Sequence, residues 1–239
     1  MFGFKKKPKV EFWSEAAGLL EVAPVTKTIA NMPAYFKQMP KKWTPDHKDP
    51  GTAKSCPGII DLFKNAYTIP LWTDIEIVIH DKNNADWHTS SESFTFSWHA
   101  SGQFLDYLPN KDEFMFTLKA DCPWFARTPK GYSLLQIPAL YSMETRFEVM
   151  TGVIRSDWHH VLNQQIVFKG KMPEDGSPAT IFLERGTPLV SYVPFKREEF
   201  DTDVRYGSTE DMTEVQHCLA RVDSKFSGAY RKRMKDDEV

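Results

Sequence analysis

Residues 75–79, Ile75-Glu76-Ile77-Val78-Ile79, place an isoleucine at every second position. Successive side chains of a β-strand point to opposite faces, so this period indicates a strand with one buried face. The segments Phe94-Thr95-Phe96-Ser97-Trp98-His99 and Phe114-Met115-Phe116-Thr117-Leu118 repeat the pattern. Further strands are expected at 131–137, 145–150, 162–169, 179–184 and 188–193. No helical pattern intervenes between them, so the sequence predicts a mainly β fold, a sandwich or a barrel.

The N-terminal segment, residues 1–55, differs from the strand-rich part by its many prolines. They are Pro8, Pro24, Pro33, Pro40, Pro45 and Pro50. Proline removes a backbone donor and fixes φ, so long helices and central strands are not expected here. We expect an extended arm that lies on its own domain or clasps a neighbouring subunit. Its expected anchors are Trp13, Tyr35, Phe36 and Trp43.

The C-terminal segment has helical periodicity instead. Ser208 and Asp211 resemble a capping box with a shorter acid. Apolar residues then recur at steps of three and four, at Met212, Val215, Leu219, Val222, Phe226 and Tyr230. The sequence therefore predicts an amphipathic helix whose apolar face packs on its own sheet or on a partner subunit. The predicted domains are an arm at 1–55, a β-rich core at 56–207 and this helix at 208–239.

Charge and composition exclude several classes of protein. The chain has 239 residues and a net charge of −2, from 30 basic and 32 acidic side chains. Such a balance gives no overall field toward nucleic acid, and we expect at most weak phosphate contact. No apolar run reaches the ~18 residues of a membrane helix, and no signal core is present, so we expect neither membrane insertion nor secretion. The residues that could contact phosphate are Lys5, Lys6, Lys7 and Lys9.

The cysteine and histidine patterns favour no metal centre. Cys56, Cys122 and Cys218 are far apart in the sequence, which indicates reduced thiols. No cofactor or metal is expected from these spacings, and no nucleophile motif is present. A histidine site assembled across strands, as in a jelly-roll metal-dependent enzyme, stays open as an alternative. Its candidate ligands are His88, His99, His159 and His160.

Three segments in the second half carry the most specific pattern. In order they are Thr128-Pro129-Lys130-Gly131-Tyr132-Ser133, Gly152-Val153-Ile154-Arg155-Ser156-Asp157-Trp158, and Ile181-Phe182-Leu183-Glu184-Arg185-Gly186-Thr187-Pro188-Leu189-Val190. Their order and spacing resemble the dUTPase and dCTP deaminase superfamily, most clearly in the second segment. The resemblance covers about a quarter to a third of the chain and implies a β-clip core.

Carried over residue by residue, the resemblance implies an altered active site. The water-activating aspartate of the family falls on Arg155, and a guanidinium stays protonated and cannot accept a proton from water. We therefore expect no catalytic residue here and no dUTP hydrolysis. If the site still binds a nucleotide, the resemblance implies that Lys130, Ser133, Asp157 and Trp158 line it.

The same resemblance implies an assembly role. β-clip proteins of this superfamily are commonly trimers, some viral head-decorating proteins share the fold, and the whole chain is similar to uncharacterised phage-encoded proteins. We therefore expect a non-enzymatic structural or assembly protein of a phage virion, found in the virion or the host cytoplasm. Its expected partners are copies of itself, a trimer being plausible, or other virion proteins. A nucleotide-binding or nucleotide-processing relative of dUTPase is the main alternative.

Overall fold

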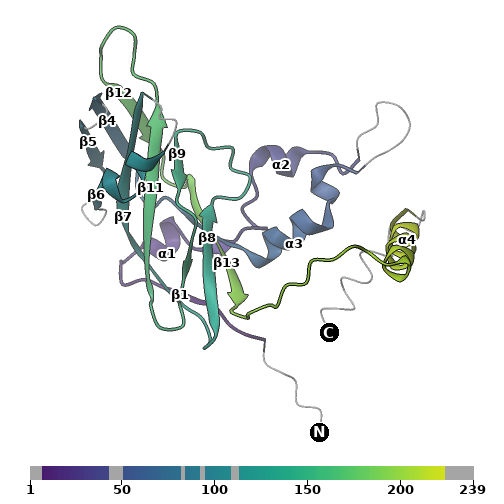
Figure 1. Ribbon diagram of the computed structural model, residues 1–239. Helices are drawn as coiled ribbons and strands as arrows, with labels where there is room; N and C mark the ends of the chain where they lie inside the picture. The colour runs from purple at the N-terminus through teal and green to yellow at the C-terminus, as the bar shows by residue number, and fades with distance from the viewer. Residues whose placement is uncertain (1–6, 43–50, 82–83, 92–94, 109–112, 224–239) are drawn as a thin grey trace. The chain divides into compact units, whose positions relative to one another are not determined.

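The computed structural model describes residues 7–42, 51–81, 84–91, 95–108 and 113–223 (Figure 1). The chain divides into two units, Met1–Arg197 and Glu198–Val239, which are described separately below. The first unit consists mainly of three antiparallel sheets, which confirms the predicted mainly β class. No helix in these residues is long and apolar enough to cross a membrane.

The first sheet is organised around one long strand, β7 (Phe114–Arg127). Side chains at every second position of this strand are buried, as the period-two pattern predicts. One edge of β7 pairs with β11 (Val161–Gly170), and β11 in turn pairs with β9 (Phe147–Val149). The opposite edge pairs with β6 (Phe96–His99) and β1 (Glu11–Trp13).

The other two sheets are also fully antiparallel. The second has the order β10-β8-β13-β3-β2, and the third has the order β12-β4-β5. The period-two segment that begins at Ile75 forms β4, the central strand of the third sheet, with all three of its isoleucines buried. The strands of the two sheets are β10 (Gly152–Ile154), β8 (Tyr132–Pro138), β13 (Pro188–Lys196), β3 (Tyr67–Pro70), β2 (Thr26–Lys27), β12 (Ala179–Leu183), β4 (Ile75–Asp81) and β5 (Asn84–Thr89).

Several short helices occur before the first long strand. α3 (Pro57–Asn65) was not expected; it begins with a proline in its first turn, where the missing N–H costs nothing. Its buried Phe63 contacts Phe36 with ring centroids 5.1 Å apart. The remaining helices are α1 (Leu19–Val22), α2 (Ala34–Gln38) and 3₁₀ turns at Ala53–Ser55, Ser101–Gln103 and Leu105–Tyr107.

The described part of the N-terminal segment packs within the first unit. Strand β1 continues the first sheet, and Trp13 stacks on Phe125 with ring centroids 5.7 Å apart. Leu19 and Phe36 are buried. Contact with a second subunit and the limits drawn at residues 55 and 207 stay predictions, and Trp43 lies outside the described residues.

The second unit contains α4 (Thr209–Asp223). Its start is the reciprocal cap expected from the sequence, since the Asp211 N–H donates to Ser208 Oγ at 3.2 Å and the Ser208 N–H donates to Asp211 Oδ2 at 2.6 Å. The predicted amphipathic helix is thus confirmed for residues 209–223. The expected positions Phe226 and Tyr230 lie outside the described residues.

Candidate functional site

Two of the three motif segments lie side by side in the second sheet. Strand β10, which starts the Gly152–Trp158 segment, pairs antiparallel with β8, which follows the turn at Lys130. The pairing brings the end of one segment onto the turn of the other, where the Gly131 N–H donates to Asp157 Oδ2 at 3.0 Å. Gly131 has a φ of +86°, a conformation that side chains with a Cβ rarely adopt.

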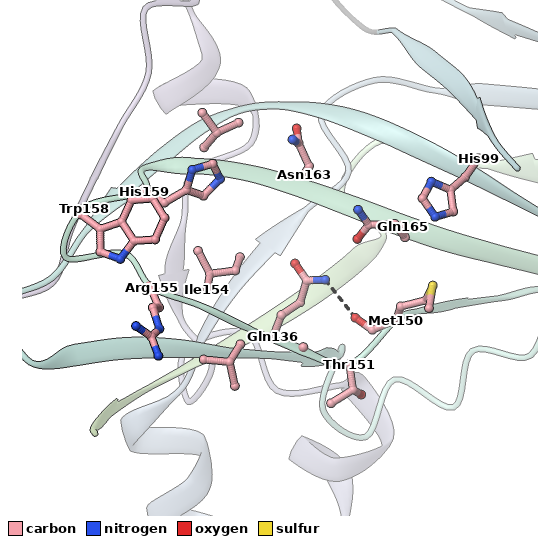
Figure 2. Close-up of a pocket in the computed structure, with 13 residues that line it drawn as sticks. His99, Gln136, Met150, Thr151, Ile154, Arg155, Trp158, His159, Asn163 and Gln165 are labelled. Atoms are coloured by element: carbon pink, nitrogen blue, oxygen red, sulfur yellow. Dashed lines mark hydrogen bonds between the residues drawn. The ribbon is translucent and has the colours of Figure 1, made fainter. Parts of the chain in front are cut away.

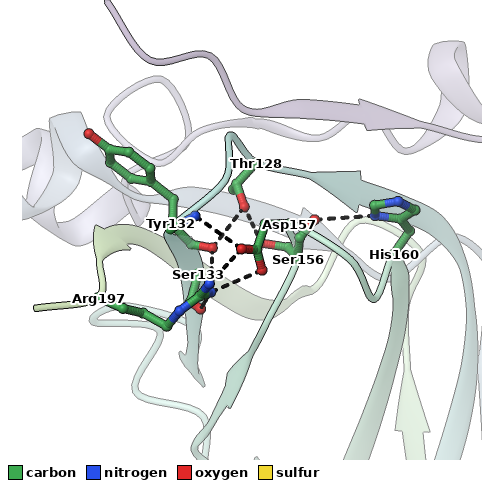
Figure 3. A network of polar contacts seen from close by, with 8 residues as sticks. Thr128, Tyr132, Ser133, Ser156, Asp157, His160 and Arg197 are labelled. Carbon is green, nitrogen blue, oxygen red and sulfur yellow. Dashed lines mark hydrogen bonds and ion pairs between the residues drawn. The ribbon is translucent and has the colours of Figure 1, made fainter.

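Arg197 holds this junction together (Figure 3). Its guanidinium forms a two-armed ion pair with Asp157, with Nη1 at 3.0 Å from Oδ1. Nη1 also donates to Ser133 Oγ at 2.6 Å and to the Tyr132 carbonyl at 2.8 Å. The hydrogen bond from Arg197, with help from the Gly131 N–H, lowers the pKa of Asp157 to about 2. The Asp157 carboxylate therefore stays ionised near neutral pH and paired with Arg197.

A second set of contacts lies beside the ion pair. The hydroxyls of Thr128 and Ser156 are 2.8 Å apart and both residues are buried. The Nδ1 atom of His160 lies 3.1 Å from the Ala126 carbonyl and 3.2 Å from the Ser156 carbonyl. Because a carbonyl oxygen only accepts, Nδ1 must carry the proton. Together these bonds fix the turn that precedes β8 and the turn that follows β10.

An open cleft of about 650 Å³ lies next to this junction (Figure 2). Arg155 and Trp158 are among its lining residues, and Trp158 is 67% exposed. Its walls come from residues 150–155 around β10, from β11 and from the end of β6. The lining residues are His99, Gln136, Met150, Thr151, Gly152, Val153, Ile154, Arg155, Trp158, His159, Val161, Asn163 and Gln165.

The described residues that line the cleft are mainly neutral polar and apolar groups, with one guanidinium. None of the described residues that line it is a carboxylate, and the guanidinium of Arg155 stays protonated and cannot accept a proton. The lining side chains that could accept a proton are the imidazoles of His99 and His159. The amides and the guanidinium supply hydrogen-bond donors and one positive charge. Such a surface fits an anionic ligand with a flat ring.

A buried network of amides and one hydroxyl meets the cleft at Gln136. Gln136, which lines the cleft, donates from Nε2 to the Met150 carbonyl at 2.9 Å. Its Oε1 accepts from the Tyr192 hydroxyl at 2.9 Å, and that hydroxyl accepts from Gln164 Nε2 at 2.8 Å. Tyr192 and Gln164 have no exposed surface, and burial raises the pKa of Tyr192 well above its usual value.

The four nucleotide-site residues expected from the sequence do not gather around one space. Ser133 and Asp157 share the Arg197 guanidinium, Trp158 lines the cleft, and Lys130 is exposed on the turn before β8. Sequence reasoning missed Arg197, which lies 40 residues from Asp157 in the chain and in no motif. It also missed the part played by Gln136, whose position on a strand face gives no sign of its polar partners.

The histidines considered as metal ligands are dispersed. In the described part of the chain no group of three or more His, Cys, Asp or Glu residues could hold a metal ion. His99 and His159 line the cleft, whereas His160 is bound to backbone carbonyls. Among the lysines considered for phosphate contact, Lys7 and Lys9 are exposed and Lys9 pairs with Glu11, whereas Lys5 and Lys6 lie outside the described residues.

No family model matches the sequence, and no curated protein matches it. Among solved structures, a variant of the dUTPase from phage phi11 of S. aureus is similar at 12% identity, over 49% of this chain and 99% of that one, with a TM-score of 0.29. The dUTPase of Staphylococcus bacteriophage 80alpha is similar at 11% identity, over 49% of this chain and 100% of that one, with a TM-score of 0.28. Both of these solved structures are phage dUTPases.

Proposed function

We propose that this protein is a non-enzymatic structural or assembly protein of a phage, acting through contacts with copies of itself or with other particle components. The observation that supports it is the altered centre of the motif region. Arg155 stands where the resembled family has a water-activating carboxylate, and no carboxylate is among the described residues that line the adjacent cleft. Asp157 is held in an ion pair with Arg197 and is not available as a base.

The second unit supports the assembly part of the proposal. Phe200 is 83% exposed, Val204 90% and Tyr206 100%. Large apolar side chains exposed in succession indicate a surface that binds a partner. Such a segment suits a protein that attaches to others more than one that works alone.

Sizing by light scattering, together with a dUTP hydrolysis assay, tests the proposal. We expect a defined oligomer, or binding to a component of the native particle, and no release of pyrophosphate above the buffer rate. A clean monomer that binds nothing in its native particle would refute the assembly role. Turnover of dUTP that disappears in an Arg155→Gln variant would refute the non-enzymatic role.

Nucleotide binding in the cleft is a second candidate, favoured by the exposed Trp158 beside Arg155. An exposed indole stacks on a base, and base–aromatic stacking is worth about 1–3 kcal/mol. A guanidinium binds phosphate oxygens through two parallel donors. The amide of Gln165 could then contact the edge of the base.

Thermal unfolding in the presence of deoxynucleotides tests this candidate. A ligand at 100 times its dissociation constant stabilises the fold by about 2.7 kcal/mol, which raises the melting temperature. The shift should vanish in Arg155→Gln and persist in the matched control Arg185→Gln, which removes an exposed guanidinium outside the cleft. Absence of any shift at millimolar nucleotide would contradict nucleotide binding.

A further inference from the structure

The cleft of the first unit lies where two of its sheets each have a free strand edge. β10 is the last strand of the second sheet, and β8 is its one strand partner among the described residues. In the first sheet β9 pairs with β11 over Ile166–Phe168 alone, so the start of β11 has no strand on that side in the described part of the chain. Ile154 of one edge and Asn163 of the other line the same cleft (Figure 2).

The backbone of Asn163 points toward the free side of β11. In an antiparallel ladder the N–H and C=O of one residue point to the same side, and those of the next residue point to the other. The Gln165 carbonyl accepts from the Met150 N–H at 2.9 Å, on the β9 side of the strand. The register with β7 is continuous from Asn163 to Gly170, so the Asn163 N–H and C=O face that side too, beyond the end of β9.

Neither edge carries the residues with which proteins block unwanted strand pairing. Free edges are usually protected by charged residues or prolines placed on the edge strand. The edge strand β10 reads Gly152-Val153-Ile154, and the start of β11 reads Val161-Leu162-Asn163-Gln164-Gln165, without a proline or a charge in either. Two unprotected edges that line one cleft of about 650 Å³ are suited to receive a further strand.

The side chains beside these edges indicate the chemistry of that strand. Arg155 lines the cleft and forms no ion pair with another described residue, and none of the described lining residues is a carboxylate. A carboxylate of a partner therefore meets a guanidinium that can bind it through two donors. Val153 and Val161 supply apolar surface in the same cleft. Because successive side chains of a strand point in opposite directions, the fitting partner is an acidic strand with apolar residues at alternate positions.

We propose that the cleft accepts an extended acidic segment of a partner protein, which adds as a strand to the free edge of β11 beside β10. In strand addition of this kind, main-chain hydrogen bonds supply the affinity and side-chain contacts the specificity. The segment is short, because β10 has three residues. The inference rests on the proposed assembly function and deepens it, by naming the cleft and the class of segment through which another particle component attaches.

Fluorescence anisotropy of a labelled synthetic peptide mixed with the full chain tests strand addition. In the peptide, valine alternates with aspartate and threonine. Asn163→Pro removes the backbone donor on the free side and keeps the pairing with β7, so binding should weaken by about tenfold or more. Asn163→Ala removes the side-chain amide but keeps the backbone N–H, so it should bind the peptide more tightly than Asn163→Pro does. Thermal unfolding of both variants checks that the sheet is retained.

A second measurement leaves the protein unchanged. Two versions of the peptide carry N-methyl groups at alternate residues, one version in each register, and a methylated amide cannot donate. A strand directs alternate donors to one edge, so at least one version should bind about tenfold more weakly. Arg155→Gln should also weaken binding, whereas the matched control Arg185→Gln, outside the cleft, should bind as the wild type does.

Each outcome separates this inference from the proposed function. Weaker binding by Asn163→Pro than by Asn163→Ala, together with loss of binding in a methylated peptide, supports strand addition. Equal binding by the two variants and by all the peptides overturns the inference and leaves the assembly role standing. A chain that binds deoxynucleotide but no peptide overturns it as well, because the cleft is then a nucleotide site. A monomer that binds the peptide but nothing in its native particle keeps the strand site and refutes the assembly role.

Discussion

Replacing Tyr192 with phenylalanine should destabilise the first unit strongly although it removes a single oxygen. That oxygen donates to Gln136 Oε1 at 2.9 Å and accepts from Gln164 Nε2 at 2.8 Å. Tyr192 and Gln164 have no exposed surface, so water cannot replace the bond from Gln164, whereas Gln136 lines the cleft and is 4% exposed. The stranded Gln164 donor costs about 1–3 kcal/mol and the lost bond to Gln136 about 0.5–1.5 kcal/mol, so we expect a loss of about 2–4 kcal/mol.

Urea unfolding at neutral pH measures this loss from the midpoint and the slope. For a unit of this size, each kcal/mol also lowers the melting temperature by about 2–4 °C. The control is Tyr107→Phe, which removes a hydroxyl from a side chain that is 80% exposed and should change the unfolding free energy by less than about 0.5 kcal/mol.

A second substitution tests the cause of the loss. Gln164 Oε1 is buried without a hydrogen-bond partner in the described structure. Gln164→Leu removes this unpaired acceptor. It also removes the Nε2 donor, which Tyr192→Phe would leave without a partner. Tyr192→Phe/Gln164→Leu should therefore be more stable than the sum of the two single changes, with a coupling of about 0.5–3 kcal/mol. Equal effects of Tyr192→Phe and Tyr107→Phe, or strict additivity, would refute the reasoning.

Two further predictions concern the ion pair and the first sheet. Arg197 lowers the pKa of Asp157 to about 2, so its stabilisation is present above about pH 4 and is lost as the pH falls toward 2. Urea midpoints of Asp157→Asn should lie below wild type at pH 7 and converge with it near pH 2; parallel curves would contradict this. Gly170→Ala places a Cβ 2.8 Å from the Phe114 ring and should cost about 1–3 kcal/mol. Gly152→Ala meets open space and should leave the melting temperature nearly unchanged; equal shifts would contradict the clash.

The strands could be predicted where large apolar side chains alternate with polar ones. Ile75, Ile77 and Ile79 form the inner face of β4 as expected. The continuation of β7 to Arg127 was not predicted, because the buried positions Ala120 and Ala126 are small and give a weak periodic signal. A hydrophobic period indicates which positions are buried, and small residues such as alanine contribute little to that signal.

The candidate site was harder to predict than the strands. The two motif segments meet as their order suggests, yet their polar side chains form hydrogen bonds mainly with one another and with Arg197. Nothing in the sequence around Arg197 indicates that its guanidinium reaches Asp157, because the contact depends on how β13 passes β8. Long-range polar pairs of this type follow from strand register, which a single sequence does not determine.

Arg197 is also the last residue of the first unit, so the tail begins where the ion pair is made. Tension applied to the tail would enter the fold at this residue. Its backbone N–H bonds to the Gly131 carbonyl at 2.8 Å, and its guanidinium reaches Ser133 and Asp157. The load would thus spread over two turns and two strands before it could peel β13 from its neighbours. The ion pair between Arg197 and Asp157 is, in mechanical terms, the anchor of a tether.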